Sequence, residues 1–173
     1  MKGSTFIIGG CRSGKSTHAL KLAEQSQVNK KLFIATCVPN DKEMENRIER
    51  HKRERSQQWE TLETPVRIPD AITDNSPTCD VILVDCLTLW ISNLFFEKKE
   101  MDEISGHVQR LTHSIKTAKC PVIIVSNEVG TGIVPENSLA RHFRDAIGFA
   151  NQNVAKSCDK VIWMVAGIPV PIK

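Results

Sequence analysis

The sequence predicts an α/β fold, and two observations along the chain carry this prediction. Short runs of β-forming residues alternate with segments of helical periodicity, and the links between them are short. The first of these runs leads directly into a glycine-rich turn, which is followed by a lysine, a serine and a helical segment. This order of strand, turn and helix is typical of P-loop domains. We therefore expect a P-loop NTPase-like, mostly parallel sheet with helices on both faces and an antiparallel C-terminal edge strand.

Length and composition set the next bounds. A chain of 173 residues can bury one hydrophobic core, so we expect residues 1–173 to form a single P-loop nucleotide-binding catalytic domain. The net charge of +3 is too small to require nucleic acid or a membrane surface as a partner. No apolar run has membrane-spanning length, and the N-terminal residues lack the apolar stretch of a signal peptide. Six cysteines without a C-x-x-C pair are typical of a reducing compartment, so we expect a cytoplasmic protein.

The glycine-rich turn fits the pattern G-x-x-x-x-G-K-[ST] at every fixed position and follows the apolar run at residues 5–8. Backbone N–H groups of such a turn surround a phosphate, and the next helix adds its positive end. Lys15 would reach the outer phosphates, and the Ser16 hydroxyl would bind a Mg²⁺ ion shared with them. An accidental turn is the alternative, but the flanking strand and helix argue against it. The predicted phosphate loop consists of Gly9, Gly10, Cys11, Arg12, Ser13, Gly14, Lys15 and Ser16.

Four segments are predicted between the first helix, which begins at Ser16, and residue 80. A short β-forming run reads as a fully buried second strand, and a possible capping box opens a strongly charged helix after it. An extended piece and a weak helix follow, and the sequence Asn75-Ser76-Pro77 ends that helix. The predicted ranges are 32–37 for the strand, about 41–55 for the charged helix, 59–63 for the extended piece and 65–75 for the weak helix.

The run at residues 81–85 consists of four β-forming residues and a final carboxylate, Asp85. In P-loop proteins a strand that ends in this way holds the magnesium ion. The alternative is a buried strand whose last residue caps the following turn, and the run alone does not separate the two. Because a phosphate loop lies upstream, we predict that Asp85 and Ser16 are the magnesium ligands.

The second half of the chain continues the alternation of helices and strands. Two helical segments can form one long crossover or a helical pair. Only two residues separate the last two β-forming runs, and the prolines of the final run place it at an antiparallel edge. The predicted helices cover about 87–98, 101–118 and 138–157, and the predicted strands cover 121–126, 160–165 and 168–172.

The strand at residues 121–126 runs into an eleven-residue loop at 127–137. Loops at the carboxyl ends of parallel strands are where open α/β sheets bind ligands, although a plain surface loop is an equal alternative. The next helix has two distinct faces. Its apolar stripe consists of Leu139, Phe143, Ile147 and Ala150, whereas Arg141, His142 and Arg144 lie on a face typical of solvent exposure.

One histidine lies on an unusual face of the charged helix. Met44, Ile48 and His51 fall at helical spacings of four and three, and Arg47 and Arg55 lie one turn on either side of His51. A histidine on such a stripe is more often a packed, hydrogen-bonded residue than a catalytic one. The spacing alone therefore leaves the role of His51 open.

Six segments together resemble the bifunctional adenosylcobinamide kinase and adenosylcobinamide-phosphate guanylyltransferase family of cobalamin assembly. The resemblance extends to Gly167-Ile168, and the motif after residue 127 is more specific than the phosphate loop. The segments are residues 9–16, Ile34 to Thr36, Arg47-Ile48 with His51-Lys52, Trp59 to Glu63, Asn127 to Gly130 with Gly132 to Asn137, and Ala140 to Asp145.

The resemblance implies roles for particular residues. In this family the histidine of the R-I-x-x-H-K segment takes GMP covalently, and here that residue is His51. Some relatives carry two adjacent histidines, whereas this chain has Arg50 before His51. The resemblance also implies a homotrimer. By the same resemblance, guanine nucleotide contacts fall on the phosphate loop and on Ile34, Ala35, Thr36, Lys52, Arg53, Glu54, Arg55, Glu63 and Asp85.

The predicted function is therefore the phosphorylation of adenosylcobinamide, followed by GMP transfer from GTP through a guanylyl-histidine. The implied cofactors are GTP, ATP and Mg²⁺, and the implied partner is the corrinoid substrate. Two alternatives are a monofunctional P-loop small-molecule kinase and a nucleotide-dependent switch or assembly ATPase. Against the switch, the N-K-x-D segment of guanine-specific switches is missing, because the nearest match at residues 29–32 lacks the aspartate.

Overall fold

A seven-stranded sheet forms the centre of the computed structural model, which describes residues 3–25, 29–39, 42, 49, 58–97 and 100–173. The strands are β1 (Ser4–Gly9), β2 (Lys31–Ala35), β3 (Trp59–Glu63), β4 (Val81–Asp85), β5 (Val122–Asn127), β6 (Lys160–Val165) and β7 (Ile168–Pro171). Their order across the sheet is β3-β2-β4-β5-β1-β6-β7. Strands β1 to β6 pair in parallel, and β7 pairs antiparallel with β6 at the edge. The predicted fold class is confirmed.

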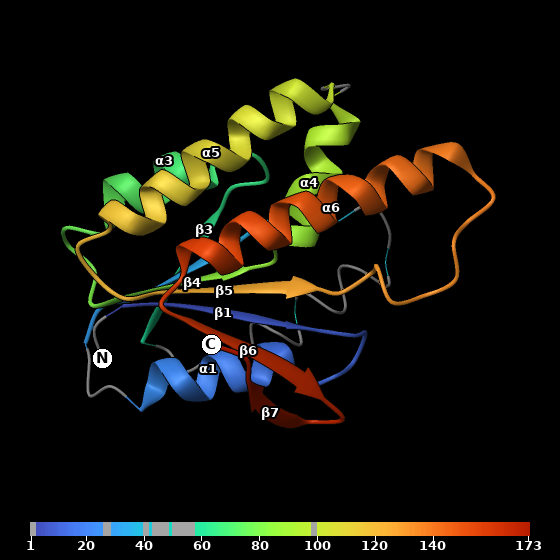
Figure 1. Ribbon diagram of the computed structural model, residues 1–173. Coiled ribbons are helices and arrows are strands. Elements are labelled where there is room, and N and C mark those ends of the chain that lie inside the picture. Colours follow the sequence, from blue (N-terminus) through green and yellow to red (C-terminus); the bar gives the residue numbers. More distant parts are fainter. Residues whose placement is uncertain (1–2, 26–28, 40–41, 43–48, 50–57, 98–99) are drawn as a thin grey trace.

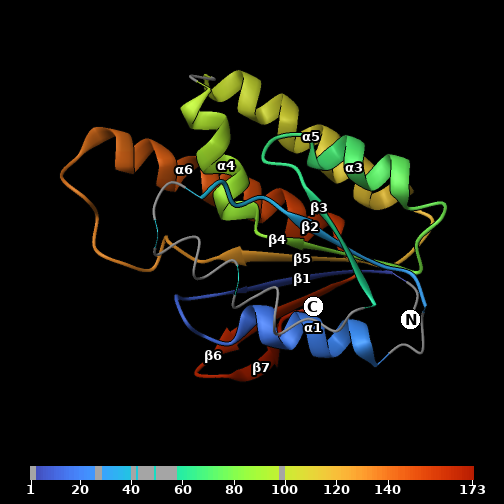
Figure 2. The ribbon, with the colours of Figure 1, turned by 180° about the vertical axis from the view of Figure 1, so that it is seen from behind.

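Helices cover both faces of this sheet (Figures 1 and 2). Most of the helices lie together on one face of the sheet. Helix α1 lies on the opposite face, and the β6–β7 hairpin curls toward that side. The helices are α1 (Lys15–Glu24) on its own face and α3 (Ile68–Asn75), α4 (Leu87–Phe96), α5 (Met101–Thr117) and α6 (Ser138–Ser157) in the opposite layer. The segments at 87–98 and 101–118 are thus a helical pair rather than one crossover helix.

The core has two halves because strand side chains alternate between the two faces. On β1, Phe6 packs into the larger cluster under α3 to α6, while its neighbour Ile7 packs against α1. The strands β2, β4 and β5 alternate in the same way, which explains why they read as continuous apolar runs. The sheet is therefore fixed firmly on both sides, and the carboxyl ends of its strands are held in place.

Several expectations differ from the structure near element ends. The weak helix expected at 65–75 begins only at Ile68, because the Pro65 and Val66 carbonyls bond to side chains of α4. Strand β2 covers Lys31–Ala35 rather than 32–37, because Thr36 leaves the ladder with β3 and bonds to the backbone after β4 instead. Leu139, expected on the buried stripe of α6, is 63% exposed. The buried stripe of α6 begins at Ala146, because its first turns project beyond the edge of the sheet (Figure 1).

The charged helix expected at about 41–55 lies outside the described residues, apart from positions 42 and 49. No helix within the described part of the chain is both long and apolar enough to cross a membrane.

Candidate active site

The phosphate loop joins β1 to α1 at the carboxyl edge of the sheet. Gly14 precedes the helix with a φ of 88°, in the left-handed region that favours glycine. Gly9 has a different constraint, since a Cβ atom there would lie 2.5 Å from the carbonyl oxygen of Met164 on β6. The turn of the β6–β7 hairpin also touches the loop, because the Gly167 N–H donates to the Ser13 carbonyl at 3.1 Å. The loop is therefore held by β6 and its turn as well as by its own helix.

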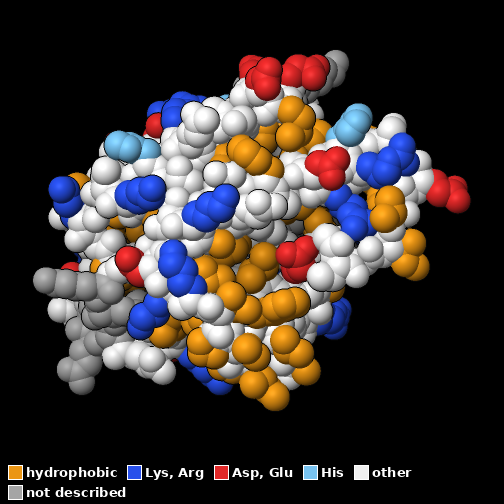
Figure 3. Space-filling view, in the orientation of Figure 1, with side chains coloured by type: hydrophobic (Ala, Val, Ile, Leu, Met, Phe, Trp, Pro, Cys, Tyr) orange, Lys and Arg blue, Asp and Glu red, His pale blue; other side chains and the backbone are white. Residues whose placement is uncertain are grey.

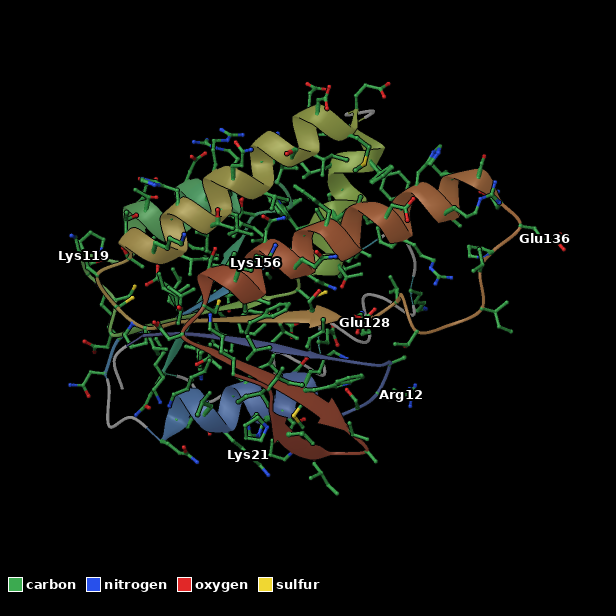
Figure 4. All side chains as sticks on the ribbon, viewed as in Figure 1. Arg12, Lys21, Lys119, Glu128, Glu136 and Lys156 are labelled. Carbon is green, nitrogen blue, oxygen red and sulfur yellow. The ribbon has the colours of Figure 1, made fainter. Side chains whose placement is uncertain are left out.

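Lys15 lies across the loop that it is predicted to serve. Its side chain is 8% exposed, and its Nζ donates to the Gly10 carbonyl at 2.5 Å and to Ser13 Oγ at 3.4 Å. The ammonium is thus on the loop, where a phosphate wrapped by the backbone N–H groups would meet it. Cys11 and Arg12 in the turn are exposed, and Figure 4 shows the Arg12 side chain pointing away from the protein.

Ser16 and Asp85 carry a hydroxyl and a carboxylate, which are the kinds of oxygen group that Mg²⁺ prefers. Ser16 lies in the first turn of α1 and Asp85 ends β4, and both are half-buried. No group of three or more His, Cys, Asp or Glu that could hold a metal occurs within the described residues. One hydroxyl and one carboxylate fit a site in which Mg²⁺ also binds phosphate oxygens and water.

The end of β2 and Thr36, which follows it, lie beside Asp85, and the side chains of Ile34 and Thr36 are buried. Ala35 is in register with Asp85 on one side and with Glu63 on the other. Ile34 and Thr36 are 0% exposed. The Thr36 hydroxyl donates to the Cys86 carbonyl and accepts from the Cys86 N–H, both at 2.8 Å. Of the predicted nucleotide contacts here, Ile34 and Thr36 can offer only backbone atoms, whereas the Glu63 side chain is exposed.

Asn93 on α4 ties the ends of two strands together, which the sequence analysis missed. Its side-chain amide donates to the Thr36 carbonyl at 2.8 Å and to the Pro65 carbonyl at 2.9 Å. Trp90 on the same helix donates to the Val66 carbonyl at 2.7 Å. A polar residue in the apolar sequence Leu87–Phe96 was the available signal. These bonds fix the chain where it leaves β2 and β3.

A network of polar side chains, which the sequence analysis also missed, is buried behind the end of β5. Ser126 Oγ donates to Asn151 Oδ1 at 2.7 Å and lies 3.3 Å from Thr88 Oγ1. Thr88 Oγ1 accepts from the Asn127 N–H at 2.8 Å, and Asn151 Nδ2 donates to the Asn127 carbonyl at 3.3 Å. Helices α4 and α6 therefore hold both backbone groups of Asn127, directly before the loop at 127–137.

Two arginines of α6 bind the backbone of that loop. Arg144 donates to the Gly130 carbonyl at 2.6 Å and to the Ile133 carbonyl at 2.8 Å. Arg141 donates to the Pro135 carbonyl at 3.1 Å and to the Glu136 carbonyl. Of the basic face predicted to be solvated, Arg141 and His142 are exposed and Arg144 is half-buried, and the two arginines also hold the loop in shape.

The model of the family described as cobinamide kinase / cobinamide phosphate guanyltransferase matches residues 5–172. The chain belongs to this family.

Curated members of the cobinamide kinase / guanyltransferase family match nearly the whole chain. The bifunctional adenosylcobalamin biosynthesis protein CobU of Escherichia coli is 39% identical, over 97% of this chain and 98% of that protein. CobU of Salmonella typhimurium is 40% identical over the same shares. CobP of Pseudomonas aeruginosa is 37% identical, over 97% of this chain and 96% of that protein. The resemblance inferred from the motifs is confirmed.

Solved structures support the fold alone. A Pyrococcus horikoshii OT3 protein, titled a structural study of PH0250, has a TM-score of 0.60 at 8% identity, over 99% of this chain and 86% of that one. The RadB recombinase has a TM-score of 0.50 at 15% identity, over 93% of this chain and 73% of that one. These values agree with a P-loop NTPase-like sheet.

Membership of the cobinamide kinase / guanyltransferase family makes the chain an enzyme. It favours the predicted kinase and guanylyltransferase over a switch or assembly ATPase. The predicted nucleophile His51 and the predicted contacts Lys52, Arg53, Glu54 and Arg55 lie outside the described residues.

Proposed function

We propose that this chain phosphorylates adenosylcobinamide and then transfers GMP from GTP to the new phosphate, in adenosylcobalamin biosynthesis. The observation that carries the proposal is the match of the cobinamide kinase / cobinamide phosphate guanyltransferase family to residues 5–172. The chain's phosphate loop, with Lys15 lying across it, is the structural feature that supports it.

In the kinase step the phosphate loop holds the triphosphate, and Lys15 contacts its outer phosphates. The aminopropanol hydroxyl of adenosylcobinamide attacks the γ-phosphate, and the nucleoside diphosphate leaves. Ser16 and Asp85 would hold Mg²⁺, which neutralises charge on the phosphates when it is bound. The phosphate donor is a nucleoside triphosphate, ATP or GTP.

In the transferase step His51 attacks the α-phosphate of GTP, and pyrophosphate leaves. The phosphate of adenosylcobinamide phosphate then displaces the histidine and gives adenosylcobinamide-GDP. The nucleophile must be a neutral imidazole, because the protonated ring has no free electron pair with which to attack. We further propose that Ile34, Ala35, Thr36, Glu63 and Asp85, with Lys52 to Arg55, form the guanine nucleotide site.

Incubation with GTP labelled at the α-phosphate tests this function. The wild-type protein should retain label through denaturation, in an acid-labile and base-stable phosphoramidate. His51→Ala should lose the label and form no adenosylcobinamide-GDP but still phosphorylate adenosylcobinamide. His113→Ala, an exposed histidine on α5, is the matched control and should keep both activities.

Other results separate the alternatives. Phosphorylation without any retained label in the wild-type protein would indicate the monofunctional kinase. Hydrolysis without transfer to adenosylcobinamide would indicate a switch or assembly ATPase. With a chiral α-thiophosphate, two displacements give net retention, so net inversion would mean direct attack by the corrinoid phosphate and exclude the covalent histidine.

We also propose that the enzyme is a homo-oligomer, with the homotrimer as the state that the resemblance implies. An exposed apolar surface on the β6–β7 hairpin supports association (Figure 3). It consists of Trp163, Val165, Ile168, Val170 and Ile172, which are 40% to 64% exposed. Light scattering should give three times the chain mass of 19.4 kDa, and a monomeric mass would exclude the proposal.

A further inference from the structure

Glu128 lies directly beside the phosphate loop, and none of the roles above uses it. It follows the last residue of β5, which is in register with Gly9 at the end of β1. Its backbone N–H donates to the Gly9 carbonyl at 3.0 Å. Figure 4 shows its side chain just beyond the end of β5, whereas Glu136 projects from the far end of the same loop.

Strand order separates Glu128 from the other carboxylates at this edge of the sheet. Glu63, Asp85 and Glu128 end or follow β3, β4 and β5, and the phosphate loop follows β1. Neighbouring strands lie about 4.8 Å apart. Strand β5 is therefore one spacing from β1, whereas β4 lies about 10 Å from β1 and β3 lies about 19 Å from β1. Glu128 is therefore the carboxylate on the strand next to the phosphate loop, and the more distant Asp85 is left for the metal.

One oxygen of the Glu128 carboxylate is used by the fold, and the other is available. Oε1 accepts from the Gly130 N–H at 2.5 Å, which fixes the direction of the side chain. Oε2 has no hydrogen-bond partner among the described residues, and the residue is only half-buried. An ionised carboxylate with one fixed and one open oxygen can accept a proton from a hydroxyl that approaches the loop.

The backbone before Glu128 is held unusually firmly for a strand end. Thr88, Ser126 and Asn151 are 8%, 0% and 6% exposed, and together they bind the N–H and the carbonyl of Asn127. Burying three polar side chains is costly unless every member is bonded, so this network marks a position whose geometry matters. Because the network holds the backbone of Asn127, it also restricts the position of the next residue, Glu128.

We propose that Glu128 is the catalytic base of phosphoryl transfer to the corrinoid hydroxyl, an assignment that rests on the proposed function. The hydroxyl oxygen forms a bond to the γ-phosphorus, and the bond from that phosphorus to the β–γ bridging oxygen breaks. The hydroxyl proton passes to Glu128 Oε2, and the nucleoside diphosphate leaves with the bridging electron pair.

The chemistry of the two acceptors makes this role specific to one step. The kinase acceptor is an alcohol, which must lose a proton as it attacks. The guanylyl acceptor is a phosphate monoester, whose second pKa near 6 leaves its oxygens already ionised at pH 7. Glu128 is therefore required for phosphorylation and dispensable for guanylyl transfer.

The test measures both steps separately in the full-length protein. Glu128→Gln keeps an oxygen that can accept from Gly130 N–H but cannot take the proton. Its kcat for adenosylcobinamide phosphorylation should fall about 10²- to 10⁴-fold with little change in the KM for nucleotide. Conversion of supplied adenosylcobinamide phosphate to adenosylcobinamide-GDP should match the wild type. Glu136→Gln, in the same loop, should leave both steps unchanged.

Chemical rescue provides a second readout that a purely structural role would not give. Glu128→Ala leaves space beside the loop, so added formate should restore part of its kinase rate in a concentration-dependent way, whereas Glu136→Ala should not respond. This measurement also serves if Glu128→Gln does not fold. Lack of rescue in a folded Glu128→Ala protein would overturn the assignment.

A wild-type kinase rate in Glu128→Gln, or an equal loss in both steps, would also overturn it. The wild-type protein in the same assays keeps the two proposals apart. If it does not phosphorylate adenosylcobinamide, the proposed function fails. If it does and the variants behave like it, only the role of Glu128 fails.

Discussion

At the scale of single residues, one ammonium group is expected to serve two different reactions. Lys15 already lies across the loop, bonded to the Gly10 carbonyl and Ser13 Oγ. A triphosphate would therefore find its positive charge in place, whether the γ- or the α-phosphorus reacts.

We predict that Lys15→Ala impairs both phosphorylation and guanylyl transfer. A hydrogen bond to a charged group is worth about 1.5 to 3 kcal/mol, so each rate should fall at least about ten- to 150-fold. Steady-state assays of the two steps measure the loss, and Lys21→Ala on the outer side of α1 is the control. Full activity in either assay would remove Lys15 from that reaction.

The cysteines provide a chemical test of the loop at the same scale. Cys11 in the loop is exposed, whereas Cys86 and Cys158 are buried. Burial raises the pKa of both Cys86 and Cys158 to about 12. At pH 8 these buried thiols would be almost entirely protonated, and the thiolate is the reactive form.

We therefore predict that iodoacetamide at pH 8 alkylates Cys11 before Cys86 and Cys158, and that GTP with Mg²⁺ slows the reaction at Cys11. Mass spectrometry of peptides after short exposures measures the order. Alkylation of Cys86 or Cys158 first, in the folded protein, would contradict the burial of these thiols. Equal labelling of Cys11 with and without nucleotide would argue against phosphate binding at the loop.

At the scale of elements, the site depends on bonds between strand ends that are distant in the chain. Thr36 after β2 bonds to the Cys86 backbone after β4, and Asn93 on α4 binds the carbonyls after β2 and β3. These contacts hold together the backbone at the ends of β2, β3 and β4. The extended piece at 59–63 is a parallel edge strand, and its pairing with β2 brings Glu63 into line with Ala35.

Thr36→Val should destabilise the protein by about 1 to 3 kcal/mol, because it leaves the buried Cys86 N–H without its partner. Urea unfolding followed by circular dichroism measures the change. Thr117→Val, at an exposed position on α5, should change the stability by less than about 0.5 kcal/mol. Equal stability of the two variants would show that the Thr36 bonds contribute little.

At the scale of the whole molecule, the carboxyl ends of β1, β4 and β5 come together although long stretches of chain separate them. A ligand bound at this edge would therefore contact the ends of three strands of the seven-stranded sheet. Its binding free energy should therefore stabilise the fold as a unit.

We predict a single thermal transition that GTP with Mg²⁺ moves to higher temperature. At 100 times its dissociation constant a ligand adds about 2.7 kcal/mol to the free energy of unfolding. Differential scanning calorimetry measures the shift, and Lys15→Ala should show a smaller one at the same concentration. Two transitions, of which only one moves, would contradict the expectation of a single domain over residues 1–173.

Some elements could be predicted from the sequence almost to the residue, and others could not. Helix α6 covers residues 138–157 as predicted, because Asn137 caps it and the apolar period continues along it. Strand β4 ends at Asp85 as predicted. The predicted end of β2 and the predicted burial of Leu139 were wrong. The end of β2 depends on the Cys86 backbone, and the exposure of Leu139 depends on where the sheet ends. Both neighbours are remote in the sequence.

The sequence by itself determined the phosphate loop, the alternation of strands and helices, and the antiparallel edge strand with its prolines. These features depend on local spacing and backbone geometry, which neighbouring residues encode directly. Only the tertiary structure decided that Thr88, Ser126 and Asn151 meet behind β5. Strand order likewise decided that Glu128, rather than Asp85 or Glu63, lies next to the phosphate loop. Such contacts depend on how distant segments pack, and no local pattern carries that information.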